Sequence, residues 1–216
     1  MDWDQARFNM VEQQIRPWDV LDLTVLQLLS VVKREDFIPA VHREMALVDM
    51  ELPLATGRRT WSPKLEARVV QEVALTGKER VLEIGTGTGY VAALLGKLAK
   101  QVYTVESDAA LAAQASAHLA AAGIQNVTVE TGDAVRGWSK HAPYDVIVAT
   151  GSYPTVPEFL FEQLAEGGRL FAIVGDEPAM SGTLFQKQGG SVVATKLFET
   201  VVAPFANAPQ PARFVF

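Results

Sequence analysis

Short apolar runs alternate with amphipathic stretches along the chain from residue 80 onward. Runs rich in branched apolar residues and bounded by glycine or polar residues predict strands. These strands are expected at residues 81–84, 102–105, 127–129, 145–149 and 169–174. Helices are expected between them, at residues 91–98, 109–122 and 157–164. Such an alternation favours a mostly parallel sheet covered by helices on both faces.

The last part of the chain has a different pattern. Residues 183–188 and 191–202 form two more strand-like runs, joined by Gly189-Gly190. A glycine turn between two such runs is typical of a hairpin, which adds an antiparallel edge. The sequence therefore predicts an α/β fold built on a doubly wound, mostly parallel, seven-stranded sheet.

Residues 1–53 have a helical pattern, in which Pro17 ends a first helix and Asp22 caps a second. A loop over 54–64, LATGRRTWSPK, precedes another amphipathic helix at 65–75. We therefore expect one compact domain with three parts. These are an N-terminal helical extension with a loop (1–76), the sheet domain (77–205) and a C-terminal tail (206–216).

The amino-acid composition excludes several classes of functional site and partner. Among the 216 residues there is no cysteine, which excludes disulfides, zinc–thiolate sites and a cysteine nucleophile, and no metal site is expected. The net charge of −6 disfavours nucleic acid as a partner. No apolar run is long enough for a membrane span, and the charged N-terminus is unlike a signal peptide. A cytoplasmic protein is expected.

The most informative segment is VLEIGTGTGY, residues 81–90, where Gly85, Gly87 and Gly89 follow a strand and precede a helix. Glycines there let the backbone turn sharply and approach a ligand closely. The dinucleotide spacing G-x-G-x-x-G would need glycine at position 90, which is Tyr90, and no Gly-Lys-Ser/Thr follows. The loop therefore fits neither a dinucleotide site nor a triphosphate site.

Acidic residues stand at three strand ends. Glu106 follows the glycine loop by about 20 residues, where a carboxylate accepts hydrogen bonds from ribose hydroxyls. Asp133, after Gly132, is placed to meet the exocyclic amine of an adenine. Together with Glu83 these residues resemble the S-adenosylmethionine (SAM) site of Rossmann-like class I methyltransferases. The predicted cofactor-binding residues are Glu83, Gly85, Thr86, Gly87, Gly89, Glu106, Gly132 and Asp133.

Longer segments narrow the resemblance. MVEQQIRPWDVLDLTVLQLLSVVKREDFIP, the Leu52-Pro53 loop, VLEIGTGTGYVAALL and YDVIVATGSYPTVPEFLFEQLAEGGRLFAIVG are similar to the protein-L-isoaspartate O-methyltransferase family. The resemblance implies SAM-dependent methylation of the α-carboxylate of isoaspartyl residues in damaged proteins, with S-adenosylhomocysteine (SAH) as product. It implies that Glu83 holds the methionine end of SAM and that the acceptor is a peptide or protein. Either a monomer or a homodimer is consistent with it.

The acceptor loop departs from the family pattern Gly-Gln-Thr-Ile-Ser-x-Pro, whose serine touches the acceptor carboxylate. The corresponding residues here are Gly57-Arg58-Arg59-Thr60-Trp61-Ser62-Pro63, so Trp61 stands at the serine position. The hydroxyls of Ser62 or Thr60, or a guanidinium of Arg59 or Arg58, are the candidates for contacting the acceptor instead.

Two alternatives follow from this departure. One is a diverged methyltransferase with a different acceptor, and the other is a non-enzymatic SAM-binding module. The intact carboxylates argue against the second. Ser152, in the turn after the fourth strand, is a further candidate for an acceptor contact.

Overall fold

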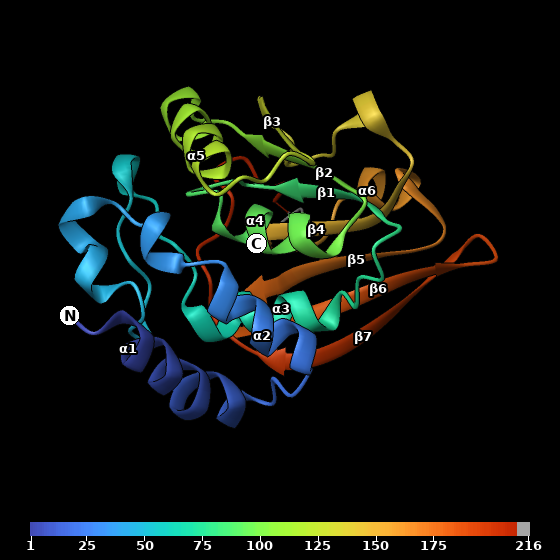
Figure 1. Cartoon of the computed structure of the whole chain (residues 1–216). Coiled ribbons are helices and arrows are strands. Elements are labelled where there is room, and N and C mark those ends of the chain that lie inside the picture. The colour runs from blue at the N-terminus through green and yellow to red at the C-terminus, as the bar shows by residue number, and fades with distance from the viewer. Residues whose placement is uncertain (211–216) are drawn as a thin grey trace, which may run out of the picture.

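A computed structural model describes residues 1–210 (Figure 1). Within them lies a seven-stranded sheet with strand order β3-β2-β1-β4-β5-β6-β7. The strands are β1 (Arg80–Ile84), β2 (Gln101–Glu106), β3 (Val127–Thr131), β4 (Tyr144–Tyr153), β5 (Leu164–Asp176), β6 (Ala179–Gln188) and β7 (Ser191–Glu199). Strands β1 to β5 pair in parallel, whereas β6 and β7 pair antiparallel. The predicted α/β fold with an antiparallel edge is confirmed.

The main differences from the predicted boundaries occur where β4 pairs with β5. Leu164 pairs with Tyr144, so it belongs to β5 and not to the helix expected over 157–164. That helix, α6, is confined to Glu158–Glu162. After an irregularity in register, β4 also continues to Tyr153, which pairs with Val174. Tertiary pairing therefore extended both strands beyond their apolar runs.

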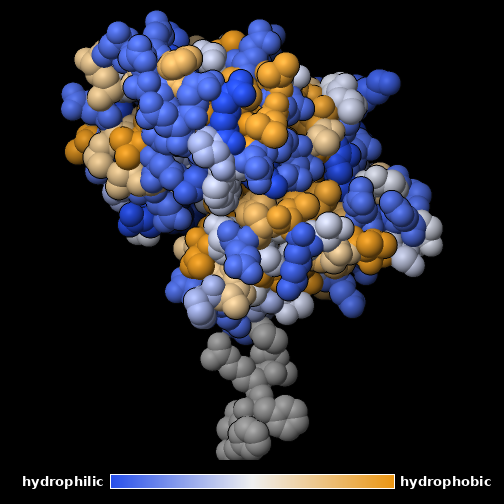
Figure 2. All heavy atoms as spheres, turned by 90° about the horizontal axis from the view of Figure 1, so that it is seen from below, coloured by the Kyte–Doolittle hydropathy of each residue, from blue (hydrophilic) through white to orange (hydrophobic). Residues whose placement is uncertain are grey.

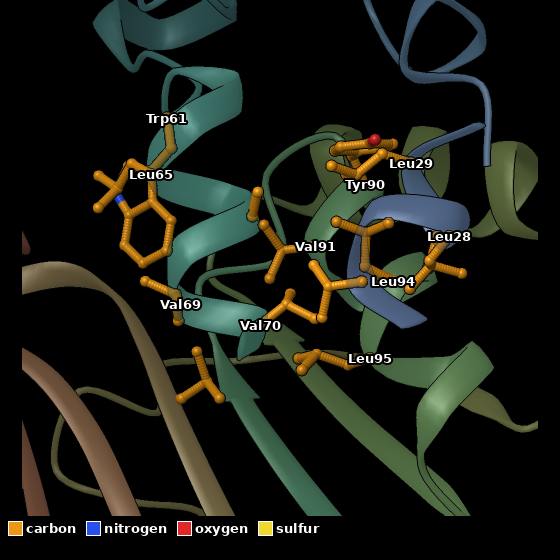
Figure 3. Close-up of a cluster of buried hydrophobic side chains, with 14 of the residues drawn as sticks. Leu28, Leu29, Trp61, Leu65, Val69, Val70, Tyr90, Val91, Leu94 and Leu95 are labelled. Atoms are coloured by element: carbon orange, nitrogen blue, oxygen red, sulfur yellow. The ribbon is translucent and has the colours of Figure 1, made fainter. Parts of the chain in front are cut away.

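Successive side chains of each inner strand point to opposite faces of the sheet. Val81 faces one hydrophobic cluster and Leu82 the other. The first cluster contains Met10 of helix α1 (Trp3–Met10) and residues from four further α-helices, and some of these residues are drawn in Figure 3. These helices are α2 (Leu23–Val31), α3 (Pro63–Glu72), α4 (Tyr90–Leu98) and α5 (Ala109–Ala121). The second cluster contains Leu160 of α6 and Ala208 from the C-terminal segment. The sheet is thus covered on both faces, as expected.

The N-terminal extension is less regular than its sequence pattern indicated. Helix α1 (Trp3–Met10) continues into a π-helical turn and then into a 3-10 turn that contains Pro17. Asp22 caps α2 as predicted, because its carboxylate accepts hydrogen bonds from two backbone N–H groups of the first turn. Two 3-10 helices, Arg34–Asp36 and Ala40–Met45, follow α2.

The extension shares its core with the sheet, since Leu29 of α2 and Val146 of β4 belong to one cluster. The division at residues 76 and 205 stays a prediction, and residues 211–216 of the predicted tail lie outside the described residues. Among residues 1–210, none of the helices is long and apolar enough to cross a membrane. The face in Figure 2 is mainly hydrophilic, with hydrophobic patches between the polar side chains.

Candidate cofactor and acceptor site

A cavity of about 530 Å³ opens at the carboxyl ends of β1, β2 and β4. The strand order reverses between β1 and β4, which is where open α/β sheets bind their ligands. Predicted cofactor residues that line this cavity are Gly85, Gly87, Glu106, Gly132 and Asp133. A smaller cavity of about 60 Å³, which shares part of this lining, also has Glu83 and Thr86 in its wall. The predicted set is therefore gathered at one edge of the sheet.

The glycine loop is tightly packed against its neighbours. At Gly85, where φ is +92°, a Cβ atom would lie 2.5 Å from the Thr150 hydroxyl oxygen. At Gly89, where φ is +86°, it would lie 3.2 Å from the Cβ of Ala115 in α5. Gly89 thus sets the start of α4 against α5 and is not part of either cavity wall. Both positions need glycine for backbone and packing reasons.

Glu83 lies beneath the loop and is fully buried. One carboxyl oxygen accepts a hydrogen bond of 2.5 Å from the Thr104 hydroxyl, which is itself 2.6 Å from the Thr86 hydroxyl. The other oxygen, Oε1, has no hydrogen-bond partner among residues 1–210. Burial raises the pKa of Glu83 to about 8, and the nearby Glu106 carboxylate adds to the increase. A buried carboxyl with one unpaired oxygen in a cavity wall is suited to a cationic ligand group.

Glu106 ends β2 and is 1% exposed. Its Oε2 accepts from the Gly87 backbone N–H at 3.0 Å, and its Oε1 accepts from the Asp108 N–H at 3.0 Å. Oε1 also forms an ion pair with Arg58 from the acceptor loop. Sequence reasoning did not anticipate this contact, because the two residues are 48 positions apart.

Asp133 lies beyond the end of β3. Its Oδ1 accepts from the Val135 N–H at 3.0 Å, and its Oδ2 accepts from the Asn207 side-chain amide at 2.8 Å. Gly132 packs against the ring of Trp138, since a Cβ there would be 2.6 Å from the ring. Glycine thus lets Trp138 support the backbone beside Asp133.

Trp138 is held in place by Glu130, which accepts a hydrogen bond from its indole N–H. Burial acts to raise the pKa of Glu130, but hydrogen bonds from Lys140, His141 and Trp138 outweigh it and lower the pKa to about 2. The carboxylate is therefore ionised at neutral pH and anchors the wall behind Gly132.

The acceptor loop brings Arg58, Arg59, Thr60 and Trp61 into the wall of the large cavity. Arg59 is directed to the rim, where its guanidinium lies 3.2 Å from the Glu51 carboxylate. The Thr60 hydroxyl accepts from the Leu52 N–H at 3.0 Å. Ser62 precedes α3 and does not line any of the cavities described for residues 1–210. The catalytic roles of Ser62, Thr60 and Arg59 stay predictions.

Trp61 is packed into the core. It is 5% exposed and lies beside Leu65 and Val69 of α3 (Figure 3). Buried Arg34 fixes the loop from behind, donating to the Trp61 carbonyl at 2.7 Å and to both carboxyl oxygens of Glu66 at 2.7 and 3.0 Å. The residue at the family serine position is thus anchored by packing and by a buried ion pair.

The C-terminal segment 202–207 forms part of the cavity wall, and no sequence signal predicted this. It is tied to the end of β4, because Ser152 N–H donates to the Ala203 carbonyl and the Ser152 hydroxyl donates to the Val202 carbonyl at 2.9 Å. Ser152 is fully buried, so its expected acceptor contact is wrong. The phenyl ring of Phe205 packs on Gly85 and Gly151.

A SAM molecule fits this chemistry. Its amino-acid end carries an ammonium group that suits the unpaired Glu83 oxygen, its ribose hydroxyls suit Glu106, and its adenine amine suits Asp133. It has no phosphate, so the glycine loop needs no lysine. The fold and this residue set together define a Rossmann-like SAM-dependent methyltransferase.

The comparisons with known proteins identify the family. The chain matches the family described as protein-L-isoaspartate(D-aspartate) O-methyltransferase over residues 6–209. Protein-L-isoaspartate O-methyltransferase of Koribacter versatilis is 40% identical over 201 residues, which cover 93% of this chain and 90% of the relative. Protein-L-isoaspartate O-methyltransferase 1 of Rhodopseudomonas palustris (strain HaA2) is 46% identical over 169 residues, covering 78% and 69%. The chain belongs to the protein-L-isoaspartate O-methyltransferase family.

Solved structures of similar fold include proteins described as members of the same family. A protein-L-isoaspartate O-methyltransferase structure has a TM-score of 0.80 at 27% identity, and the match covers 94% of this chain and 65% of that longer chain. A putative family member from Plasmodium falciparum, solved in complex with S-adenosyl-L-homocysteine, has a TM-score of 0.76 at 17% identity and supports the fold, with 94% and 98% covered. Family membership confirms the expected enzyme class and its SAM cofactor.

Proposed function

We propose that this chain transfers a methyl group from SAM to the α-carboxylate of L-isoaspartyl residues in proteins. One observation carries the proposal beyond family membership. Glu106, Asp133 and the acceptor loop line the same cavity of about 530 Å³, so cofactor and acceptor groups can meet there. A volume of this size is typical of a small-molecule site.

Each of the three carboxylates is suited to a different part of SAM. Glu83 offers its unpaired oxygen to the methionyl ammonium of SAM. Glu106 accepts hydrogen bonds from the ribose hydroxyls, and Asp133 accepts one from the adenine amine. When bound, SAM supplies a methyl group activated by its sulfonium charge.

The acceptor needs no general base. An aspartyl-type carboxyl has a reference pKa near 4 and is ionised at neutral pH. The chain therefore has to hold a carboxylate oxygen in line with the methyl group and to exclude water, and such orientation can contribute roughly 7–11 kcal/mol. The packed position of Trp61 is suited to walling this space. The methyl ester then collapses to a succinimide, which permits repair of the backbone.

The alternative of a diverged acceptor rests on Trp61 at the serine position and on the Arg58-Arg59 pair. The family match extends across the acceptor loop to residue 209, so it does not favour this alternative. The same match argues against a non-enzymatic binding module.

The test is transfer of labelled methyl from SAM to an isoaspartyl peptide and to its aspartyl isomer, followed by release in base. We expect base-labile label on the isoaspartyl peptide alone. Equal labelling of both peptides, or no labelling while SAH binds in the same sample, would refute the proposed acceptor.

A further inference from the structure

Arg58 joins the two halves of the site. It belongs to the acceptor loop, yet its guanidinium pairs with Glu106 and also donates to the Ser107 hydroxyl at 2.8 Å. Its side chain is 39% exposed, whereas that of Glu106 is 1% exposed. An acceptor-side cation thus lies on the carboxylate that the cofactor ribose requires.

Few hydrogen-bond-accepting positions on the Glu106 carboxylate remain free for a ligand. A carboxylate has about four lone-pair positions. Backbone N–H groups of Gly87 and Asp108 take one on each oxygen, and Arg58 takes another on Oε1, which the Ser107 hydroxyl also approaches at 3.5 Å. A ribose diol needs one position on each oxygen for its two hydroxyls. The diol and Arg58 therefore compete for Oε1.

The loop backbone can stay in place while the guanidinium leaves. The Arg58 carbonyl accepts from the Leu54 N–H at 2.7 Å, and Thr60 N–H donates to the Leu52 carbonyl at 2.8 Å. These bonds anchor the backbone at the arginine itself and two residues beyond it. Only the side chain has to rotate, and Arg58 already lines the cavity.

The acidic residues in the cavity wall indicate what the released Arg58 guanidinium can bind. Glu51, Glu106, Asp108 and Asp133 all line the cavity, so an anionic acceptor meets a negative wall. Arg59 is already paired with Glu51 at the rim. A guanidinium released from Glu106 is a planar donor matched to a carboxylate, which it can bind through two hydrogen bonds.

We propose that Arg58 is the acceptor-carboxylate-binding residue of this enzyme and that the cofactor ribose releases it from Glu106, so that cofactor binding strengthens acceptor binding. This inference rests on the proposed function. By linkage, the acceptor must strengthen cofactor binding by the same factor. The enzyme then binds an acceptor carboxylate most tightly when the cofactor is bound.

The first measurement is SAH affinity by calorimetry for the wild type, Arg58→Gln and the matched control Arg59→Gln. Removing the competing guanidinium is expected to tighten SAH binding about three- to fivefold, the range for a partly exposed ion pair. Arg59→Gln removes the same charge from the same loop without a contact to Glu106, so its SAH affinity should match the wild type. Adenosine should show the gain in Arg58→Gln, whereas 2′,3′-dideoxyadenosine, which lacks the diol, should not.

The second measurement is binding of an isoaspartyl peptide with and without saturating SAH. In the wild type and in Arg59→Gln, SAH should tighten peptide binding at least threefold, whereas Arg58→Gln should bind weakly in both states. Kinetically, Arg58→Gln should raise the KM for the peptide and lower the KM for SAM. Unchanged or weaker SAH binding in Arg58→Gln, or an intact SAH–peptide coupling, overturns the inference. A wild type that binds SAH but does not label the isoaspartyl peptide refutes the proposed function instead, so the two failures are distinguishable.

Discussion

The raised pKa of Glu83 is expected to make cofactor binding depend on pH. Burial is the main cause of the increase, to about 8. In the role proposed for Glu83, only the ionised carboxylate holds the ammonium group of SAH or SAM. At pH 6 about 1% of the Glu83 carboxyls are ionised, and at pH 7.5 about a quarter are. SAH affinity should therefore rise about 25-fold between these pH values, equal to about 1.9 kcal/mol.

The assay is titration calorimetry with SAH from pH 6 to 7.5, a range in which an α-amino group stays mostly protonated. Binding at pH 7 should release about 0.9 proton, because the ligand cation lowers the pKa of Glu83. Buffers of different ionisation enthalpy measure this release directly. A flat affinity for the wild type, or binding without proton release, would show that the carboxyl does not hold the ligand cation.

Two variants serve as controls. Glu83→Gln should bind SAH weakly and with no dependence on pH in this range, since an amide does not titrate. Thr104→Val removes the hydroxyl that donates to Glu83 and helps to hold its pKa down. It should shift the affinity curve to higher pH without abolishing binding at pH 7.5.

Four further outcomes follow from the packing. Arg34→Met should lower the free energy of unfolding by about 3–5 kcal/mol, because it leaves Glu66 buried without its partner; chemical denaturation measures the loss, and Arg34→Met with Glu66→Leu should recover much of it. Gly85→Ala should abolish SAH binding in calorimetry while circular dichroism stays native, since the added Cβ would lie 2.5 Å from a hydroxyl oxygen. Trp61→Ser should destabilise the protein by about 3–5 kcal/mol, whereas Trp61→Phe should cost much less, so a stable Trp61→Ser would contradict the packed indole. The lowered pKa of Glu130 contributes stability that is present above its ordinary value of 4.5 and is lost as pH falls toward about 2, and acid titration of Glu130→Gln should lack this loss.

The sequence by itself determined the fold class and which of the predicted cofactor residues gather at one edge of the sheet. Strand and helix periodicities are local, so the alternation after residue 80 predicted the sheet and its hairpin edge. The glycine loop follows β1 directly, Glu106 is the last residue of β2, and Asp133 comes two residues after β3. Their positions at strand ends brought them to one edge of a parallel sheet without further information.

Only the tertiary structure decided the acceptor half. The pairing of Arg58 with Glu106 joins residues 48 positions apart, and the wall formed by residues 202–207 comes from the far end of the chain. Ser152 looked available in a loop but is buried by that same segment. Such contacts depend on how distant segments pack against each other, which local patterns do not encode. The unpaired oxygen of Glu83 and its raised pKa have the same origin, since burial is a property of the whole fold.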